Sequence, residues 1–144
     1  MDTLKIQGLD KLLSKLNSLE QSDVIQAGLE KACKRVEASA KQKCPVDTGA
    51  LKASITHTVE EDKGIIGTNM EYAPYVELGT GKFAKNGHGR KTPWAYEDPK
   101  TGELIWTAGQ RPQPFLHPAL SENAEAIQND FKTEVRKKIT EVFK

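Results

Sequence analysis

The N-terminal third of the chain places its apolar residues at helical spacing. One face of the first segment carries Leu9, Leu12, Leu13, Leu16 and Leu19, which predicts a short amphipathic helix. A longer apolar series from Val24 to Ala40 predicts a second helix, with Ser22 as its N-cap and an end before Pro45. After Pro45, either Asp47 or Thr48 is expected to cap one helical turn that presents Leu51 to the core.

The middle of the chain changes to the two-residue period of β-strands. Ile55, His57 and Val59 alternate with threonines, and after a charged turn an apolar run returns at 65–68, which predicts a β-hairpin. A short helix is expected at 72–78, with Pro74 in its first turn and glycines at its end. Apolar runs at 94–96 and 104–106 flank a turn signal at 98–102, so we expect a second hairpin inside a protruding segment, residues 82–111.

The C-terminal part reads as extended chain followed by a long helix. Prolines favour an extended course for residues 111–116, and Pro118 is expected to open the last helix. One face of that helix carries Leu120, Ala124, Ile127, Phe131, Val135, Ile139 and Val142. These elements predict a single α+β domain over residues 1–144, with two N-terminal helices, a small antiparallel sheet with an added hairpin, and the long C-terminal helix packed on the sheet.

Charge is balanced overall but uneven along the chain. With 28% charged residues, 37% hydrophobic residues and a net charge of +1, the chain is neither a disordered tail nor a generic binder of polyanions. Residues 46–78 carry a net −4 and residues 79–114 a net +3, a pattern that suits head-to-tail self-association. No run of about 18 apolar residues and no signal peptide is found, so we expect a protein made in the cytoplasm, without membrane contact.

The sequence offers little to an enzyme. Cys33 and Cys44 lie about 16 Å apart on one expected helix, which excludes a disulfide between them and favours buried apolar side chains. The histidines are scattered, the glycines near Lys82 lack the spacing of a phosphate loop, and no nucleophile elbow occurs. We therefore expect no catalytic residue, no metal and no cofactor. A hydrolase of unknown type is an alternative that rests only on these scattered histidines and on the carboxylates.

The expected second hairpin combines aromatic and basic residues and is the candidate interface. Its residues are Arg90, Lys91, Trp94, Tyr96, Trp106 and Arg111. Two interpretations stay open. The aromatic side chains pack on a neighbouring subunit, or they stack on bases while the cations contact phosphate in a weak DNA contact. The first is favoured because the overall basicity expected of a nucleic-acid binder is missing.

Three segments together resemble the gene-product-ten-like family of tailed phages: residues 45–55 (PVDTGALKASI), 72–81 (YAPYVELGTG) and 113–120 (QPFLHPAL). Each motif alone is weak, whereas the ordered series is specific, and the resemblance spans about residues 5–144. The motif residues are Asp47, Thr48, Gly49, Leu51, Tyr72, Pro74, Glu77, Gly79, Thr80, Gly81, Pro114, Phe115 and Pro118.

The resemblance implies a structural subunit of the virion neck or tail, which assembles as a homo-oligomeric ring. Its expected partners are head-closure, tail-terminator or tail-tube proteins. Within the motifs, Gly49 is expected to allow a close backbone approach, and the residues around Phe115 are expected to hold the long helix on the sheet. Ring size, the state of the free protein and the type of tail are left open.

Overall fold

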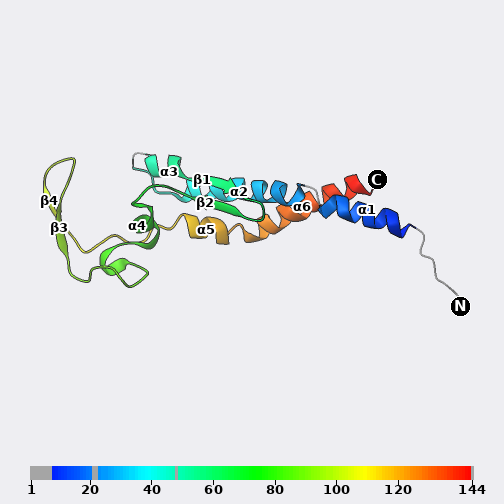
Figure 1. The fold of residues 1–144 in the computed structure, drawn as a ribbon. Helices are drawn as coiled ribbons and strands as arrows, with labels where there is room; N and C mark the ends of the chain where they lie inside the picture. The colour runs from blue at the N-terminus through cyan, green and yellow to red at the C-terminus, as the bar shows by residue number, and fades with distance from the viewer. Residues whose placement is uncertain (1–7, 21–22, 48, 144) are drawn as a thin grey trace.

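The computed structural model describes residues 8–20, 23–47 and 49–143. Figure 1 shows an elongated body with a hairpin projecting at one end and helices α1 (Leu9–Glu20) and α6 (Ala124–Val142) at the other. Helices and two separate antiparallel two-stranded sheets make up the described chain, which confirms the α+β class.

Helix α2 (Val24–Lys43) is the element around which the body is built. It packs against β1 (Thr56–Val59), β2 (Gly64–Gly67), α5 (Leu116–Ser121) and α6. The helix ends before Pro45 as expected. Its N-cap position is Asp23, which makes no side-chain capping bond, and the expected cap Ser22 lies outside the described residues.

The C-terminal helix departs from the prediction in two ways. It is broken into α5 and α6, and it begins at Leu116, two residues before Pro118. At the break, the Asn123 side-chain amide donates to the Ala119 carbonyl oxygen at 2.7 Å, which ends one helix where the next begins. The main packing partner of α6 is α2, so the expectation that the long helix packs on the sheet was wrong.

The predicted hairpin of β1 and β2 is present, with the expected alternation of exposure. Thr56 pairs with Gly67 and Val59 with Gly64, while His57 and Val59 are half-buried and the intervening threonines are exposed. His57 lies between the carboxylates of Glu37 and Glu30 on α2, with Nε2 at 2.9 Å from Glu30. Its bond to Glu37, followed by that to Glu30, raises the pKa of His57, and the two bonds tie the strand to the helix.

An ion pair joins α2 to α6. Arg35 donates to both carboxylate oxygens of Asp130, at 2.7 and 3.0 Å. Asp130 is only 5% exposed, and the hydrogen bond from Arg35 lowers the pKa of its carboxyl group against the opposing effect of burial. The two-pronged bond fixes the angle of the guanidinium and hence the register of the two helices.

The core lies where α2, α3 (Ala50–Ser54) and α5 meet. Phe115 and Ile55 are its fully buried large side chains. Leu51 is also buried, as expected. The other members of this core cluster are Val36, Ala40, Cys44, Ala73 and Ala119.

The start of α3 corrects the predicted cap. Its N-cap position is Gly49, in the left-handed region at φ 84°, without a side-chain capping bond. Asp47 is therefore not the cap, and Thr48 lies outside the described residues. Nothing lies within 4 Å of a Cβ built on Gly49, so this glycine serves the backbone angle and not a close approach.

Both cysteines are buried and unpaired, as the helical spacing predicted. Cys33 has a further role, because its Sγ lies 2.2 Å from the point where a Cβ on Gly64 would be. The sulfur occupies the space that the missing side chain leaves, and β2 thereby lies directly on α2.

Gly64→Ala should therefore lower the free energy of unfolding by about 1–3 kcal/mol through overpacking, measured by urea denaturation. Gly67→Ala in the same strand is the matched control, since nothing lies within 4 Å of its Cβ. Adding Cys33→Ala to Gly64→Ala should recover part of the loss because it removes the sulfur. Equal effects of the two glycine variants would contradict this account of the packing.

Candidate functional site: the projecting hairpin and its base

Strands β3 (Trp94–Glu97) and β4 (Leu104–Thr107) form the expected second hairpin, which Figure 1 shows standing away from the body. Trp94 pairs with Thr107 and Glu97 with Leu104. The turn is closed at Asp98, whose side chain accepts from the Lys100 N–H at 2.8 Å and whose carbonyl accepts from the Gly102 N–H at 2.7 Å. At the tip, the Lys100 Nζ lies 3.8 Å from the Asp47 carboxylate of the body.

The hairpin is apolar on both faces. By the antiparallel register, Trp94, Tyr96 and Ile105 share one face, and Leu104 and Trp106 lie on the other. Trp106 is 70% exposed, Leu104 is 68% exposed and Tyr96 is 43% exposed. The Leu104–Trp106 face is largely uncovered, whereas Trp94 and Ile105 on the other face are half-buried. A sheet in a globular protein usually has one apolar face that is packed, and neither face of this hairpin is fully covered.

The aromatic residues therefore do not gather into the single surface that the sequence suggested. Trp94 and Trp106 lie on opposite faces, so one ligand cannot stack on both. Arg90 lies over the Trp94 ring, with 5.7 Å from its Cζ to the ring centroid. Arg111 instead lies over Phe83 at 5.1 Å, and belongs to the base of the hairpin.

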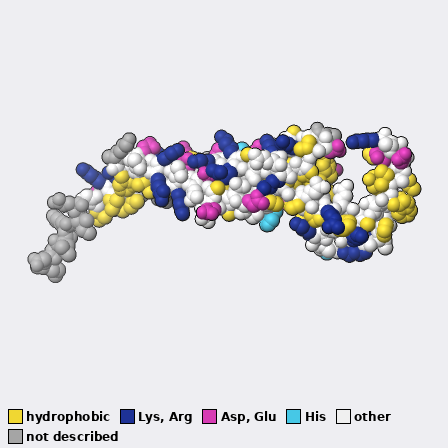
Figure 2. Space-filling view, turned by 180° about the vertical axis from the view of Figure 1, so that it is seen from behind, with side chains coloured by type: hydrophobic (Ala, Val, Ile, Leu, Met, Phe, Trp, Pro, Cys, Tyr) yellow, Lys and Arg dark blue, Asp and Glu magenta, His cyan; other side chains and the backbone are white. Residues whose placement is uncertain are grey.

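Basic side chains surround this base. Lys and Arg gather there in Figure 2, beside the hydrophobic side chains of the hairpin itself. Within the described residues, none of the five has a carboxylate within ion-pair distance: Lys82, Lys85, Arg90, Lys91 and Arg111. The positive charge predicted for residues 79–114 is thus concentrated and unneutralised at one place.

Backbone hydrogen bonds between two distant segments hold the hairpin to the body. The Thr80 N–H donates to the Gln110 carbonyl at 2.9 Å, and the Gln110 N–H returns a bond to the Thr80 hydroxyl at 2.8 Å. The Lys82 N–H, in the short 3-10 turn η1 (Gly81–Phe83), donates to the Ala108 carbonyl at 3.1 Å. Thr80 is therefore a structural residue of the base.

Glycine makes this crossing of the chain possible. A Cβ on Gly81 would lie 2.2 Å from the Ala108 carbonyl oxygen, and one on Gly109 would lie 2.2 Å from the Thr80 carbonyl oxygen. Both residues also have positive φ, at 59° and 117°. Gly79 ends α4 (Ala73–Leu78) at φ 79°, as the sequence predicted, and packs on Pro112.

Glu77 on α4 is the residue that joins the second and third motifs. Its Oε2 accepts the N–H groups of Phe115 and Leu116 at 2.7 and 3.0 Å, and its Oε1 accepts that of His117 at 2.9 Å. The next residue, Pro118, has no N–H. The start of α5 is thereby left without an unsatisfied donor, although no residue of that helix supplies a side-chain cap.

The charge of Glu77 is stabilised in this position. Burial alone would raise the pKa of its carboxyl group, but the bonds from the three backbone N–H groups outweigh burial and lower it. Sequence reasoning placed Glu77 on a short helix and missed this role, because the acceptor and the donors are separated by nearly 40 residues.

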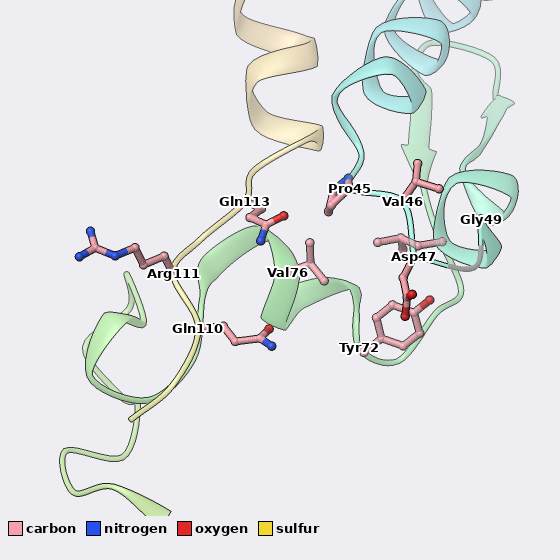
Figure 3. A pocket seen from close by; sticks show the side chains of 10 residues that line it. Pro45, Val46, Asp47, Gly49, Tyr72, Val76, Gln110, Arg111 and Gln113 are labelled. Atoms are coloured by element: carbon pink, nitrogen blue, oxygen red, sulfur yellow. The ribbon is translucent and has the colours of Figure 1, made fainter. Parts of the chain in front are cut away.

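The first two motifs and the returning arm of the hairpin enclose a pocket of about 320 Å³. Figure 3 shows Pro45, Val46, Asp47 and Tyr72 on one side and Gln110 and Gln113 on the other, with the Arg111 side chain directed away. Asp47 and Tyr72 are exposed, whereas Leu51 and Phe115 are buried. Some motif residues therefore lie in the core, and others are exposed around the base of the hairpin.

A family model described as "Bacteriophage HK97-gp10, putative tail-component" matches residues 10–79. Over this segment, which is just under half of the chain, the sequence is similar to that family. The match takes in the first motif and the second as far as Gly79, whereas the third motif and the hairpin lie beyond it. The match supports a structural role as a component of the phage tail, and similarity to a structural family argues against enzymatic activity.

No curated protein and no solved structure matches the chain. In the described part of the chain, no three His, Cys, Asp or Glu side chains are grouped so that they could hold a metal ion. Nor is any described helix both long and apolar enough to cross a lipid bilayer.

Glu77→Gln should lower the free energy of unfolding by about 1–3 kcal/mol, because the amide has one acceptor oxygen, whereas the two carboxylate oxygens accept three backbone N–H groups. The control is Glu71→Gln, an exposed carboxylate beside the same helix. The pKa of Glu77 is lower in the folded state than in the unfolded state. The extra stability of wild type over Glu77→Gln is therefore fully present above the ordinary carboxyl pKa. It should shrink as the pH falls through the lowered pKa. If the difference in free energy of unfolding between wild type and Glu77→Gln does not change with pH, the role of the charge is contradicted.

Gly81→Ala should open the base of the hairpin, since its Cβ would meet the Ala108 carbonyl oxygen. The matched control is Gly87→Ala, which has a similar φ of 73° but nothing within 4 Å of its Cβ. Both variants bear the backbone cost of about 1–2 kcal/mol. Only Gly81→Ala should speed amide hydrogen exchange at Thr80 and Lys82. Similar exchange in the two variants would show that the crossing tolerates a side chain.

Proposed function

We propose that the chain is a structural subunit at the head–tail interface of the phage, a neck or tail-completion protein that assembles as a ring. The observation that carries this proposal is the hairpin of β3 and β4, which projects from the body with apolar side chains on both faces. An exposed apolar element of this kind is typical of a protein–protein contact, in which both of its faces are covered by other subunits.

The free energy available from covering the hairpin is substantial. Full burial of one side chain of the size of Leu is worth about 1.5–3 kcal/mol, and tryptophan offers a larger area. Leu104 and Trp106 are both more than two-thirds exposed, so most of this free energy is unused in the single chain. Tryptophan and arginine are also the residues that most often dominate protein interfaces.

The charge distribution favours association of like chains. The hairpin base carries five unpaired cations, while Glu61, Asp62 and Glu71 of the body are exposed carboxylates. Opposite charges on separate surfaces of one chain attract the next copy in a head-to-tail sense, and such contacts close into rings. Head-closure, tail-terminator or tail-tube proteins are the partners expected at either side of that ring.

A weak contact to DNA is the second candidate. It is favoured by the unpaired Arg90, Lys91 and Arg111, and by the exposed part of the Trp94 face beside Arg90. It is weakened by the position of Trp106 on the opposite face, which removes one of the expected stacking partners. A ring that DNA passes through would combine both contacts.

The function is tested by replacing residues 95–106 with Gly-Gly in the phage that encodes the chain. The replacement closes across the paired Trp94 and Thr107 and leaves the hydrogen-bonded base in place. We expect complete heads and complete tails that are not joined, seen by electron microscopy of the lysate. The conservative Thr101→Ser at the hairpin tip should give normal particles.

Joined, infectious particles from the replacement would contradict the proposed role of the hairpin. Lysates that contain heads but no tails would place the protein in tail construction and contradict a position at the head–tail interface. The helical circular dichroism of the purified replacement chain checks that its body is folded.

A further inference from the structure

A second apolar surface lies on the body, apart from the hairpin. Two adjoining depressions of about 460 and 410 Å³ follow β2, α4 and α5, and share Leu116. We call them together the β2–α5 groove, lined mainly by Ile65, Ile66, Met70, Leu78, Leu116 and Leu120. Leu120 is 54% exposed and Ile65 is 46% exposed, so the groove is open to an incoming side chain.

The rim of the groove is acidic. Glu71 lines one depression, and the turn with Glu60, Glu61 and Asp62 directly precedes Gly64 and Ile65, which line the other. Only Glu60 of these four has an ion-pair partner in the described chain, Lys63 at 3.2 Å. The groove is therefore an apolar trough with uncompensated negative charge at its borders, the reverse of the hairpin base.

We propose that the β2–α5 groove receives the Leu104–Trp106 face of the hairpin from a second copy of this chain. This inference rests on the proposed ring and names the contact that would build it. Each surface is apolar at its centre. The charge attraction acts between the acidic border of the groove and the basic base of the hairpin, next to the Trp106 end of the face, whereas Glu97, which pairs with Leu104, lies toward the tip. A contact between two different surfaces of the same chain is heterologous, which is the contact that rings require.

The occupant is a second copy and not the same molecule's own hairpin. The hairpin is tied to its own body at the base, and its tip is directed by Lys100 toward Asp47 at the N-terminal side of α3. Asp47 lies in the wall of the motif pocket and not in the groove. A neighbouring hairpin thus meets a groove that its owner leaves empty.

Three paired substitutions test the contact, each at exposed positions and each matched for secondary-structure preference. The hairpin variant is Leu104→Thr with Trp106→Thr. The groove variant is Ile65→Thr with Leu120→Gln. The control is Leu12→Gln with Leu16→Gln on α1, where two leucines of comparable exposure, 43% and 46%, form another apolar surface.

The measurement is native mass by light scattering after size exclusion, with concentration and salt varied. Wild-type chain and the α1 control should form multimers, and the hairpin and groove variants alone should be monomeric. Their equimolar mixture should form a one-to-one dimer and nothing larger, because only one of the two possible contacts is intact. Raising the salt from about 0.05 to about 0.5 M should weaken all assemblies.

Several results would overturn the inference. One is a groove variant that assembles like wild type while the hairpin variant does not, because the hairpin would then dock elsewhere. A second is loss of assembly in the α1 control, which would place the contact on that helix. Another is a mixture that stays monomeric. Wild-type chain that is monomeric at about millimolar concentration would exclude a second copy as the occupant. Head–tail joining in the phage is a separate readout, so the proposed function can survive any of these results.

Discussion

The carboxylate of Glu77 is the contact on which the functional end of the molecule depends. It accepts three consecutive backbone N–H groups at the start of α5, and it does so from a helix that directly precedes the hairpin base. Phe115, the first of these donors, is fully buried in the core. One side chain therefore fixes where the chain leaves the body, where it returns and how the returning segment enters the core.

Around this point the molecule divides into a packed body and an uncovered extension. The body has conventional layers, with α2 between the β1–β2 hairpin and α6, and its close contacts use small residues such as Gly64 against Cys33. The extension has no core of its own and is attached through backbone bonds and glycines. A rigid attachment of an apolar hairpin keeps the entropy cost of docking low, which suits a subunit that binds by presenting a preformed element.

The family match covers residues 10–79 and stops where the extension begins, so α5 and α6 of the body lie beyond it. The motif residues explain this boundary in physical terms. Gly49 supplies a left-handed turn, Leu51 fills the core, and Glu77 and Gly79 prepare the exit of the chain. Of the surfaces that we assign to assembly, the hairpin lies beyond this segment. The groove combines residues within it, such as Ile65, with Leu116 and Leu120 beyond it.

The sequence by itself determined the existence and type of most elements, because apolar periodicity, proline and glycine act within a few residues. The helices at 9–20 and 24–43, both hairpins and the glycine end of α4 follow from such local signals. Only the tertiary structure decided that the last helix breaks at Asn123 and packs on α2, that Gly49 and not Asp47 starts α3, and that Trp94 and Trp106 face apart. It alone revealed the bond of Glu77 to α5, since a contact between residues almost 40 positions apart leaves no periodic trace in the chain.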